Sequence, residues 1–293
     1  MTASGPALSR LLEWLPWRLR SRNNLMMCAA NWFFEGVKNT PPLKVPPESE
    51  VEVHSLICHR DVNMMLTSAK SFLSYLPNVA LVLHDDGSIT PGDLALFEQH
   101  LPGARVVSRA EADAAMRAAL PPDVFAARAR YFFLLKLFDF NHFNRARKTI
   151  LLDSDIVFLA APREIVEWAQ TPDAPPFYNE DWCPSYRAKT VPPGVALPPR
   201  LNAGFMGYDG RFTLQQIWEC CRSVDYWLED QTIYALLLAG RKAQALDSAR
   251  YRVYTGGSVE PTTPMVHFIS PNRFTTLLYP RLARRVHVAL RRG

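Results

Sequence analysis

The amino-acid sequence predicts an α/β fold built on a mostly parallel, doubly wound sheet. Between residues 51 and 160, short apolar runs alternate with segments whose apolar residues recur at helical spacing. Such strand–helix–strand alternation is typical of parallel sheets covered by helices. The run at residues 148–159 is apolar on both sides of two aspartates, which predicts a strand buried on both faces. A hydrophobic content of 48% with 21% charged residues is enough for a full core.

The elements follow one another regularly through the first half of the chain. Turn residues such as the Asp-Gly pair at 86–87 separate them. His84, Asp85 and Asp86 end the second strand, where they either form a plain turn, the interpretation we favour, or contact a nucleotide. Strands are expected at 51–58, 78–88, 104–108 and 148–159, and helices at 63–76, 92–101, 111–120 and 123–141.

The second half of the chain is less regular. Residues 174–200 hold seven prolines among aromatic and charged residues. A loop of this length in a compact domain is usually a functional lid or a binding loop. A helix is expected from Thr213 to about Trp227, a second one within 228–240, and a strand at 264–268.

One domain is expected at residues 48–275, between an N-terminal leader and linker at 1–47 and a tail at 276–293. The linker is rich in proline at 39–50, where neither a helix nor a central strand can form.

Both ends of the chain are basic and contain apolar residues. Residues 9–22 mix Leu, Trp and Arg, a composition suited either to lying in a membrane interface or to docking on the domain. Residues 281–293 place five Arg among Leu and Val. This tail fits peripheral contact with anionic membrane lipid and a solvated helix equally well.

The bulk composition excludes several classes of protein. The sequence has no run of eighteen apolar residues that would span a membrane, and its start lacks the pattern of an export signal. The net charge of +5 lies largely at the two ends, so it does not indicate a nucleic-acid partner. Scattered cysteines without a CxxC pair fit a reducing cytoplasm and argue against structural zinc: Cys28, Cys58, Cys183, Cys220 and Cys221.

The two aspartates of the 148–159 run indicate a metal site. Side chains alternate along a strand, so Asp153 and Asp155 are expected on one side and Ser154 on the other. Two adjacent carboxylates repel each other and are costly to bury without a cation between them. A divalent metal is the natural partner, and an exposed turn with two solvated carboxylates is the alternative.

Further polar residues are candidate partners for these carboxylates. Each has an ordinary structural explanation as well: a tight turn, a helix cap, a buried core histidine or a solvated lysine. Their occurrence in one chain, in this order, favours a common site. They are Lys136, Asn202-Ala203-Gly204, Glu229-Asp230-Gln231, His267 and Arg273.

With these residues the chain resembles the GT-A glycosyltransferases, which have a Rossmann-like fold, and most closely glycosyltransferase family 8, the glycogenin and bacterial galactosyltransferase group. The resemblance runs from about Val51 to Phe274. It implies that Asp153, Asp155 and His267 hold manganese, with magnesium as the alternative, on a nucleotide-sugar diphosphate. The Pro-rich loop would then lie on the acceptor side.

The same resemblance assigns the remaining residues. It implies that Lys136 contacts the donor, as do Ser154 and the Asn202-Ala203-Gly204 segment, with Asn202 on the sugar hydroxyls. It places Asp230 and Gln231 in the catalytic centre, with Asp230 also on the sugar hydroxyls and Gln231 beneath the anomeric carbon. Arg273 would contact phosphate.

The chain also departs from the family pattern. Ser270 and Arg273 stand where the family usually has Gly and Lys after the histidine, and Thr232 stands where a second Asp is common. The base-reading motif of the first strand is poorly matched in ICHRDVN.

We therefore expect a metal-dependent hexosyltransferase that moves a sugar from a nucleotide donor, expected to be a UDP-sugar, to a glycan or lipid-linked acceptor. Retention of the anomeric configuration follows from the resemblance alone. Two alternatives remain at this point: a nucleotidyltransferase, and a non-catalytic nucleotide- or glycan-binding protein with the same fold. A nucleotidyltransferase is disfavoured because no Gly-rich phosphate loop follows the first strand.

Overall fold

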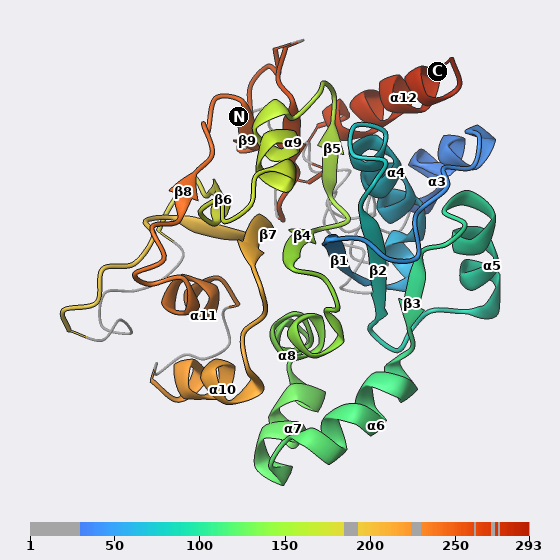
Figure 1. Cartoon of the computed structure of the whole chain (residues 1–293). Helices are drawn as coiled ribbons and strands as arrows, with labels where there is room; N and C mark the ends of the chain where they lie inside the picture. The colour runs from blue at the N-terminus through green and yellow to red at the C-terminus, as the bar shows by residue number, and fades with distance from the viewer. Residues whose placement is uncertain are drawn as a thin grey trace, which may run out of the picture.

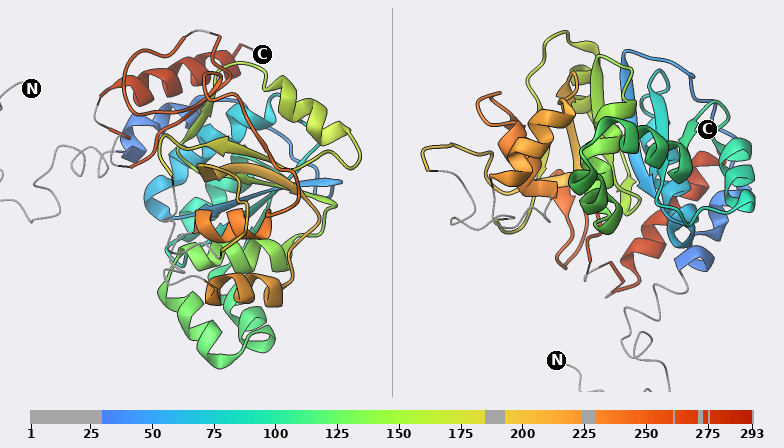
Figure 2. Two further views of the ribbon diagram at one scale, coloured as in Figure 1. Left: turned by 90° about the vertical axis from the view of Figure 1, so that its left-hand side faces the viewer. Right: turned by 90° about the horizontal axis from the view of Figure 1, so that it is seen from below.

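A computed structural model describes residues 30–184, 193–223, 230–260, 262–270, 273–274 and 276–292 of the chain. Its centre is a seven-stranded sheet in the order β3-β2-β1-β4-β7-β6-β8. Helices cover both faces of this sheet, as the left view of Figure 2 shows. The strands are β1 Val51–Ile57, β2 Ala80–Asp85, β3 Arg105–Val107, β4 Lys148–Leu152, β6 Phe177–Glu180, β7 Leu201–Asp209 and β8 Gln244–Ala245 (Figure 1).

The sheet is mostly parallel, as predicted. β1 pairs in parallel with β2 and β4, and β2 with β3. β7 is antiparallel to both of its neighbours, β4 and β6. The longer helices are α4 Val62–Leu73, α5 Pro91–His100, α6 Arg109–Ala119, α7 Pro122–Arg130, α8 Phe133–Phe143, α9 Arg163–Gln170, α10 Leu214–Arg222, α11 Asp230–Leu237 and α12 Leu278–Leu290.

Apolar side chains on the two faces of the sheet form separate cores. Ile150 and Leu152 of β4 pack in one core with residues of α4 and α9. Leu151, on the opposite face, packs in the other core with residues of α8 and α11. The alternation along β4 explains why the strand is apolar throughout.

The expected single strand at residues 148–159 is wrong. β4 ends at Leu152, and the chain turns through Asp153–Asp155 into β5 (Ile156–Phe158), which belongs to a second, three-stranded sheet. In that sheet β5 is antiparallel to β10 (Met265–His267), which also pairs with β9 (Tyr251–Val253). Two carboxylates are too polar for a buried ladder, so the chain leaves the sheet where they occur.

The expectation of one long loop at 174–200 is partly wrong, because β6 lies within it. Phe177 is buried and packs its ring edge-on against Trp168, with the centroids 4.9 Å apart. This packing of an aromatic pair holds the strand against the core despite the neighbouring prolines. Residues 185–192 of the segment lie outside the described part.

The two ends of the described chain lie next to each other. Phe34, in the segment that follows α3 (Ala30–Phe33), packs on Tyr279 of α12 with ring centroids 4.5 Å apart. As expected, residues 40–50 form neither helix nor strand. The basic segment at 9–22 lies outside the described residues. Within the described part, no helix has the length and apolar character needed to cross a membrane.

Candidate metal and donor site

The turn between β4 and β5 is held in place by hydrogen bonds from three other elements. The Asp153 amide donates to the Gly204 carbonyl of β7 at 2.8 Å, and the Ser68 hydroxyl of α4 donates to the Asp153 carbonyl at 3.0 Å. The Tyr279 hydroxyl of α12 donates to the Ser154 carbonyl at 3.2 Å. Because separate elements bond to its backbone, the turn presents its carboxylates in a fixed position.

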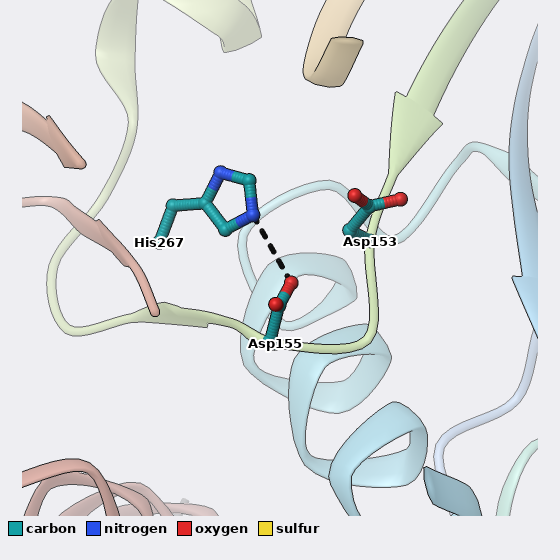
Figure 3. Close-up of side chains that lie close together, drawn as sticks. All are labelled: Asp153, Asp155 and His267. Atoms are coloured by element: carbon teal, nitrogen blue, oxygen red, sulfur yellow. Dashed lines mark ion pairs between the residues drawn. The ribbon is translucent and has the colours of Figure 1, made fainter. Parts of the chain in front are cut away.

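The two carboxylates of this turn converge with an imidazole (Figure 3). Ligand atoms of Asp153, Asp155 and His267 all lie within 4.8 Å of one another. His267 Nε2 lies 3.1 Å from Asp155 Oδ1, because β5 and β10 pair with His267 opposite Ile156. The break after Leu152 thus brings His267 to the carboxylates, and the three residues form the predicted cluster although the strand was predicted wrongly.

The site is buried on one side and open on the other. The side chains of Asp155 and His267 are 6% and 3% exposed, whereas that of Asp153 is 32% exposed. A ligand therefore reaches this cluster from the Asp153 side.

Arg273 supplies positive charge to the buried carboxylate. Its guanidinium pairs with Asp155 Oδ2 and lies 3.7 Å from Asp61 Oδ2, just before α4. Burial opposes ionisation of Asp155, but Arg273 and His267 outweigh it and hold the pKa of the Asp155 carboxyl well below its ordinary value. Asp155 is therefore ionised and ready to bind a cation.

Lys136 of α8 occupies the other side of the site. Its ammonium donates to Asp153 Oδ1 at 2.8 Å and lies 3.2 Å from Asp230 Oδ2. Burial favours the neutral amine, but these two carboxylates outweigh it and raise the pKa of Lys136 above its ordinary value. Asp230, at the start of α11, is thereby linked to the Asp153 turn.

β7 forms the floor of the site. Gly204 leaves the space that the His267 ring and the Asp153 carboxylate occupy, since a Cβ there would lie 2.8 Å from Asp153 Oδ2 and overlap the His267 ring. Asn202, on the same strand face, accepts from the Gly204 amide at 2.9 Å and donates to Asp181 Oδ2 at 3.1 Å. Both polar atoms of the Asn202 side-chain amide are thus hydrogen-bonded to protein groups.

The other predicted residues lie around this centre. Ala203 is on the opposite face of β7 and packs in the core with α8 and α11. Ser154 lies between the two aspartates and is half-buried. Gln231 is half-buried beside Asp230, and its backbone amide donates to Asp230 Oδ1 at 2.9 Å. Glu229 lies outside the described residues.

The donor set fits a divalent cation. Asp155 Oδ1 is buried and lies 3.1 Å from His267 Nε2, and it accepts no hydrogen bond from any other group within the described part of the chain. A cation bound by this oxygen would compensate for its burial. Two carboxylates and an imidazole are a common ligand set for manganese or a similar divalent ion.

Two acidic residues of the site were not found from the sequence. Asp61 contacts Arg273, and Asp181 holds Asn202. Asp181 directly follows β6, so recognising that strand would have marked it, because polar residues at strand ends are frequent in ligand sites. Asp61 lies in the ICHRDVN segment, where the sequence offered no clear pattern.

The aspartates at the end of β2 form the plain turn that we favoured. Asp85 Oδ1 accepts from the Gly87 amide at 2.7 Å, and Asp86 Oδ1 accepts from the Ser88 amide at 2.9 Å. His84 is buried against His54, with ring nitrogens 2.9 Å apart.

Comparisons with known proteins agree on the fold. No protein-family model and no curated protein matches the sequence. Among solved structures, the galactosyltransferase LgtC in complex with donor and acceptor sugar analogues is similar at 15% identity and a TM-score of 0.56, over 81% of this chain and 95% of that one. The bifunctional glycosyltransferase WbbM is similar at 15% identity and a TM-score of 0.52, over 82% of this chain and 50% of that one. The chain therefore has the predicted GT-A fold.

Proposed function

We propose that this protein is a metal-dependent glycosyltransferase that moves a sugar from a nucleotide-diphosphate sugar, expected to be a UDP-sugar, to a glycan or lipid-linked acceptor with retention of configuration. The observation that carries the proposal is the convergence of Asp153, Asp155 and His267 at one turn of a GT-A fold. The adjacent cations Lys136 and Arg273 suit an anionic diphosphate.

The three converging side chains would hold the metal, for which manganese is the best candidate and magnesium the alternative. When bound, a divalent ion acts as a Lewis acid that stabilises negative charge on the leaving diphosphate. Arg273 adds to this charge stabilisation, because Asp155 and Asp61 keep its guanidinium at the edge of the site.

Lys136 links the metal side of the site to the sugar side. Its ammonium lies between Asp153 and Asp230, so a donor that enters here meets a cation flanked by two carboxylates. We assign Lys136 to donor binding. Asp230 and Gln231, at the start of α11, are assigned to the reacting sugar, where a carboxylate and an amide dipole would stabilise an oxocarbenium-like carbon.

The segment from Asn202 to Gly204 is assigned to donor positioning. Asp181 fixes the Asn202 amide, and Gly204 keeps the floor of the site clear. The next residue after Asp181, Trp182, is 60% exposed, and its amide donates to Asp181 Oδ1 at 2.7 Å. An exposed indole at this position offers an apolar face for an acceptor sugar.

A reducing, cytoplasmic location is part of the proposal. The described cysteines Cys58, Cys183, Cys220 and Cys221 are all free thiols.

A donor screen tests the proposed function. Nucleotide-sugars are incubated with the protein and manganese, with and without chelator, and release of free nucleoside diphosphate is measured. We expect one or a few donors to be turned over, with activity lost in chelator and in Asp155→Asn. A nucleotidyltransferase would instead release pyrophosphate from a nucleoside triphosphate and a sugar phosphate. Nucleotide-sugar binding without turnover of any donor, even with a panel of acceptor sugars, would leave a non-catalytic binding protein.

A further inference from the structure

The C-terminal helix α12 carries a large share of the protein's positive charge. α12 and the two residues that follow it carry five arginines and no acidic residue, and the formal net charge of the whole chain is +5. The rest of the sequence is therefore neutral on balance. The five are Arg281, Arg284, Arg285, Arg291 and Arg292.

α12 is docked on the domain, and its arginines face outward. Tyr279, Leu282, Ala283 and Val286 are buried, in one cluster with Val157 of β5. All five arginines are exposed. Within the described part of the chain none of them forms an ion pair with a carboxylate, whereas arginines elsewhere, such as Arg128, do. The helix thus presents fixed, uncompensated positive charge.

Apolar side chains and grooves accompany this charge. A groove of about 500 Å³ on one side of α12 is lined by Arg281, Arg284 and Arg285 together with Phe158 and Leu159. A second groove of about 460 Å³ shares Arg281 and Arg284 and is lined by Trp32 and Leu277. Trp32 is 71% exposed and Leu277 is 43% exposed. We call the five arginines, Trp32 and Leu277 the α12 surface.

We propose that the α12 surface binds the anionic headgroups of a membrane. Arginines supply electrostatic attraction to anionic lipid, an exposed tryptophan and leucine suit the headgroup–acyl boundary, and apolar grooves lined with arginine match a phospholipid, which is anionic at one end and apolar at the other. Nucleic acid would match the charge but not the exposed Trp32 and Leu277.

The α12 surface is also connected to the candidate site. Tyr279, in the first turn of α12, bonds through its hydroxyl to the Ser154 carbonyl between the two metal-site aspartates. A protein that rests on a membrane through α12 therefore keeps this turn close to the lipid surface. The lipid proposal does not require the proposed transferase activity, since it is tested by binding alone.

Vesicle sedimentation tests this inference. The full chain is mixed with vesicles of phosphatidylcholine, with or without phosphatidylglycerol, at low and at physiological ionic strength. We expect binding only to the anionic vesicles, weakened by salt. The triple variant Arg281→Gln/Arg284→Gln/Arg285→Gln should bind about 100-fold more weakly. Its matched control is Arg163→Gln/Arg211→Gln/Arg222→Gln, which removes the same charge from exposed positions outside α12 and should bind like the wild type.

A second variant separates insertion from charge. Trp32→Ser should weaken binding to anionic vesicles at both salt concentrations, because it removes an apolar contact that salt does not screen. The proposal is overturned if both triple variants bind alike, which would indicate attraction by net charge only. It is also overturned if the wild type binds neutral vesicles as well as anionic ones. A third contradicting result is a combination of two: a DNA duplex competes fully with the anionic vesicles for the wild type, and Trp32→Ser binds those vesicles as tightly as the wild type does.

Discussion

Gly204 and His267 lie so close that a Cβ on the glycine would overlap the imidazole ring at Cε1. The same Cβ would lie 2.8 Å from Asp153 Oδ2 and 2.9 Å from Asn202 Oδ1. Gly204 is therefore required by the space of the site, because every other residue would move at least one proposed ligand.

The first prediction follows from this contact. Gly204→Ala should weaken manganese binding on the order of 10–100-fold, because His267 and Asp153 must move apart to admit the methyl group. Titration calorimetry measures the affinity. Gly92→Ala is the matched control, since the nearest side-chain atom to a Cβ there is Thr90 Oγ1 at 3.7 Å. Equal manganese affinities in the two variants would contradict the claim that the metal site requires a residue without a side chain at position 204.

The second prediction concerns catalysis. Gln231 is assigned to the reacting sugar and not to the metal, so Gln231→Ala should lower kcat on the order of 100-fold while manganese and nucleotide affinities stay within about twofold. Transfer rates and calorimetry are measured on the same preparation. If nucleotide affinity falls as much as kcat does, Gln231 contributes to donor binding and not to the reaction of the sugar.

The third prediction concerns a buried ion cluster. The Arg128 side chain is fully buried and binds Asp139 with two nitrogens, at 2.6 and 2.5 Å, and Asp113 with the third at 2.6 Å. Arg128→Met should lower the free energy of unfolding by about 3–5 kcal/mol, because it leaves Asp139 buried without a partner.

The double variant Arg128→Met/Asp139→Leu is the informative comparison. It should recover much of the lost stability in denaturant unfolding, since no unpaired charge remains on α8. If single and double variants lose the same amount, the cluster stabilises by packing and not by charge pairing. Arg163→Met, at an exposed position, should change stability by no more than about 0.5 kcal/mol.

The fourth prediction concerns pH. His287 of α12 is buried, and its Nε2 lies 2.8 Å from the Thr67 hydroxyl of α4. Burial, with smaller contributions from Arg291 and Lys70, lowers the pKa of His287 from 6.5 to about 4. Between these values the unfolded chain binds a proton that the folded chain does not, so stability rises with pH through this window and is lost as pH falls.

The free energy of unfolding should fall by roughly 3 kcal/mol between pH 6.5 and pH 4 because of His287. His287→Gln keeps a donor for Thr67 but does not titrate, so its unfolding free energy should fall less over the same range. Other buried histidines titrate in both proteins, and the difference between the two curves isolates His287. Parallel curves would show that protonation of His287 is not linked to folding.

Much of the fold was predictable because local patterns agreed with tertiary packing. β2 begins with a continuous apolar run and β1 has valines at alternate positions, and both become parallel strands of the sheet, while α4 has apolar residues at helical spacing. The break within residues 148–159 was not predictable, since the sequence is apolar on both sides of it. The two carboxylates end the first strand, and the pairing of β5 with β10, more than a hundred residues later, places the next apolar run in a second sheet.

The site was predictable to the extent that its residues carry unusual chemistry for their surroundings. Asp153 and Asp155 are marked by the apolar residues around them, and His267 by its place at the end of a short strand. Asp181 was missed because proline-rich flanks concealed β6, and Asp61 because its role depends on Arg273, which approaches from the far end of the sequence.

The most direct test of the central claim is calorimetric titration of manganese, and then of UDP, into the wild type, His267→Ala and the control His142→Ala. His142 lies in the last turn of α8 and is not one of the three converging residues. If Asp153, Asp155 and His267 form one metal site for a diphosphate, His267→Ala should weaken manganese binding and, with it, manganese-dependent UDP binding, while His142→Ala leaves both unchanged. Wild-type affinity for both ligands in His267→Ala would contradict the account and leave His267 as a core histidine.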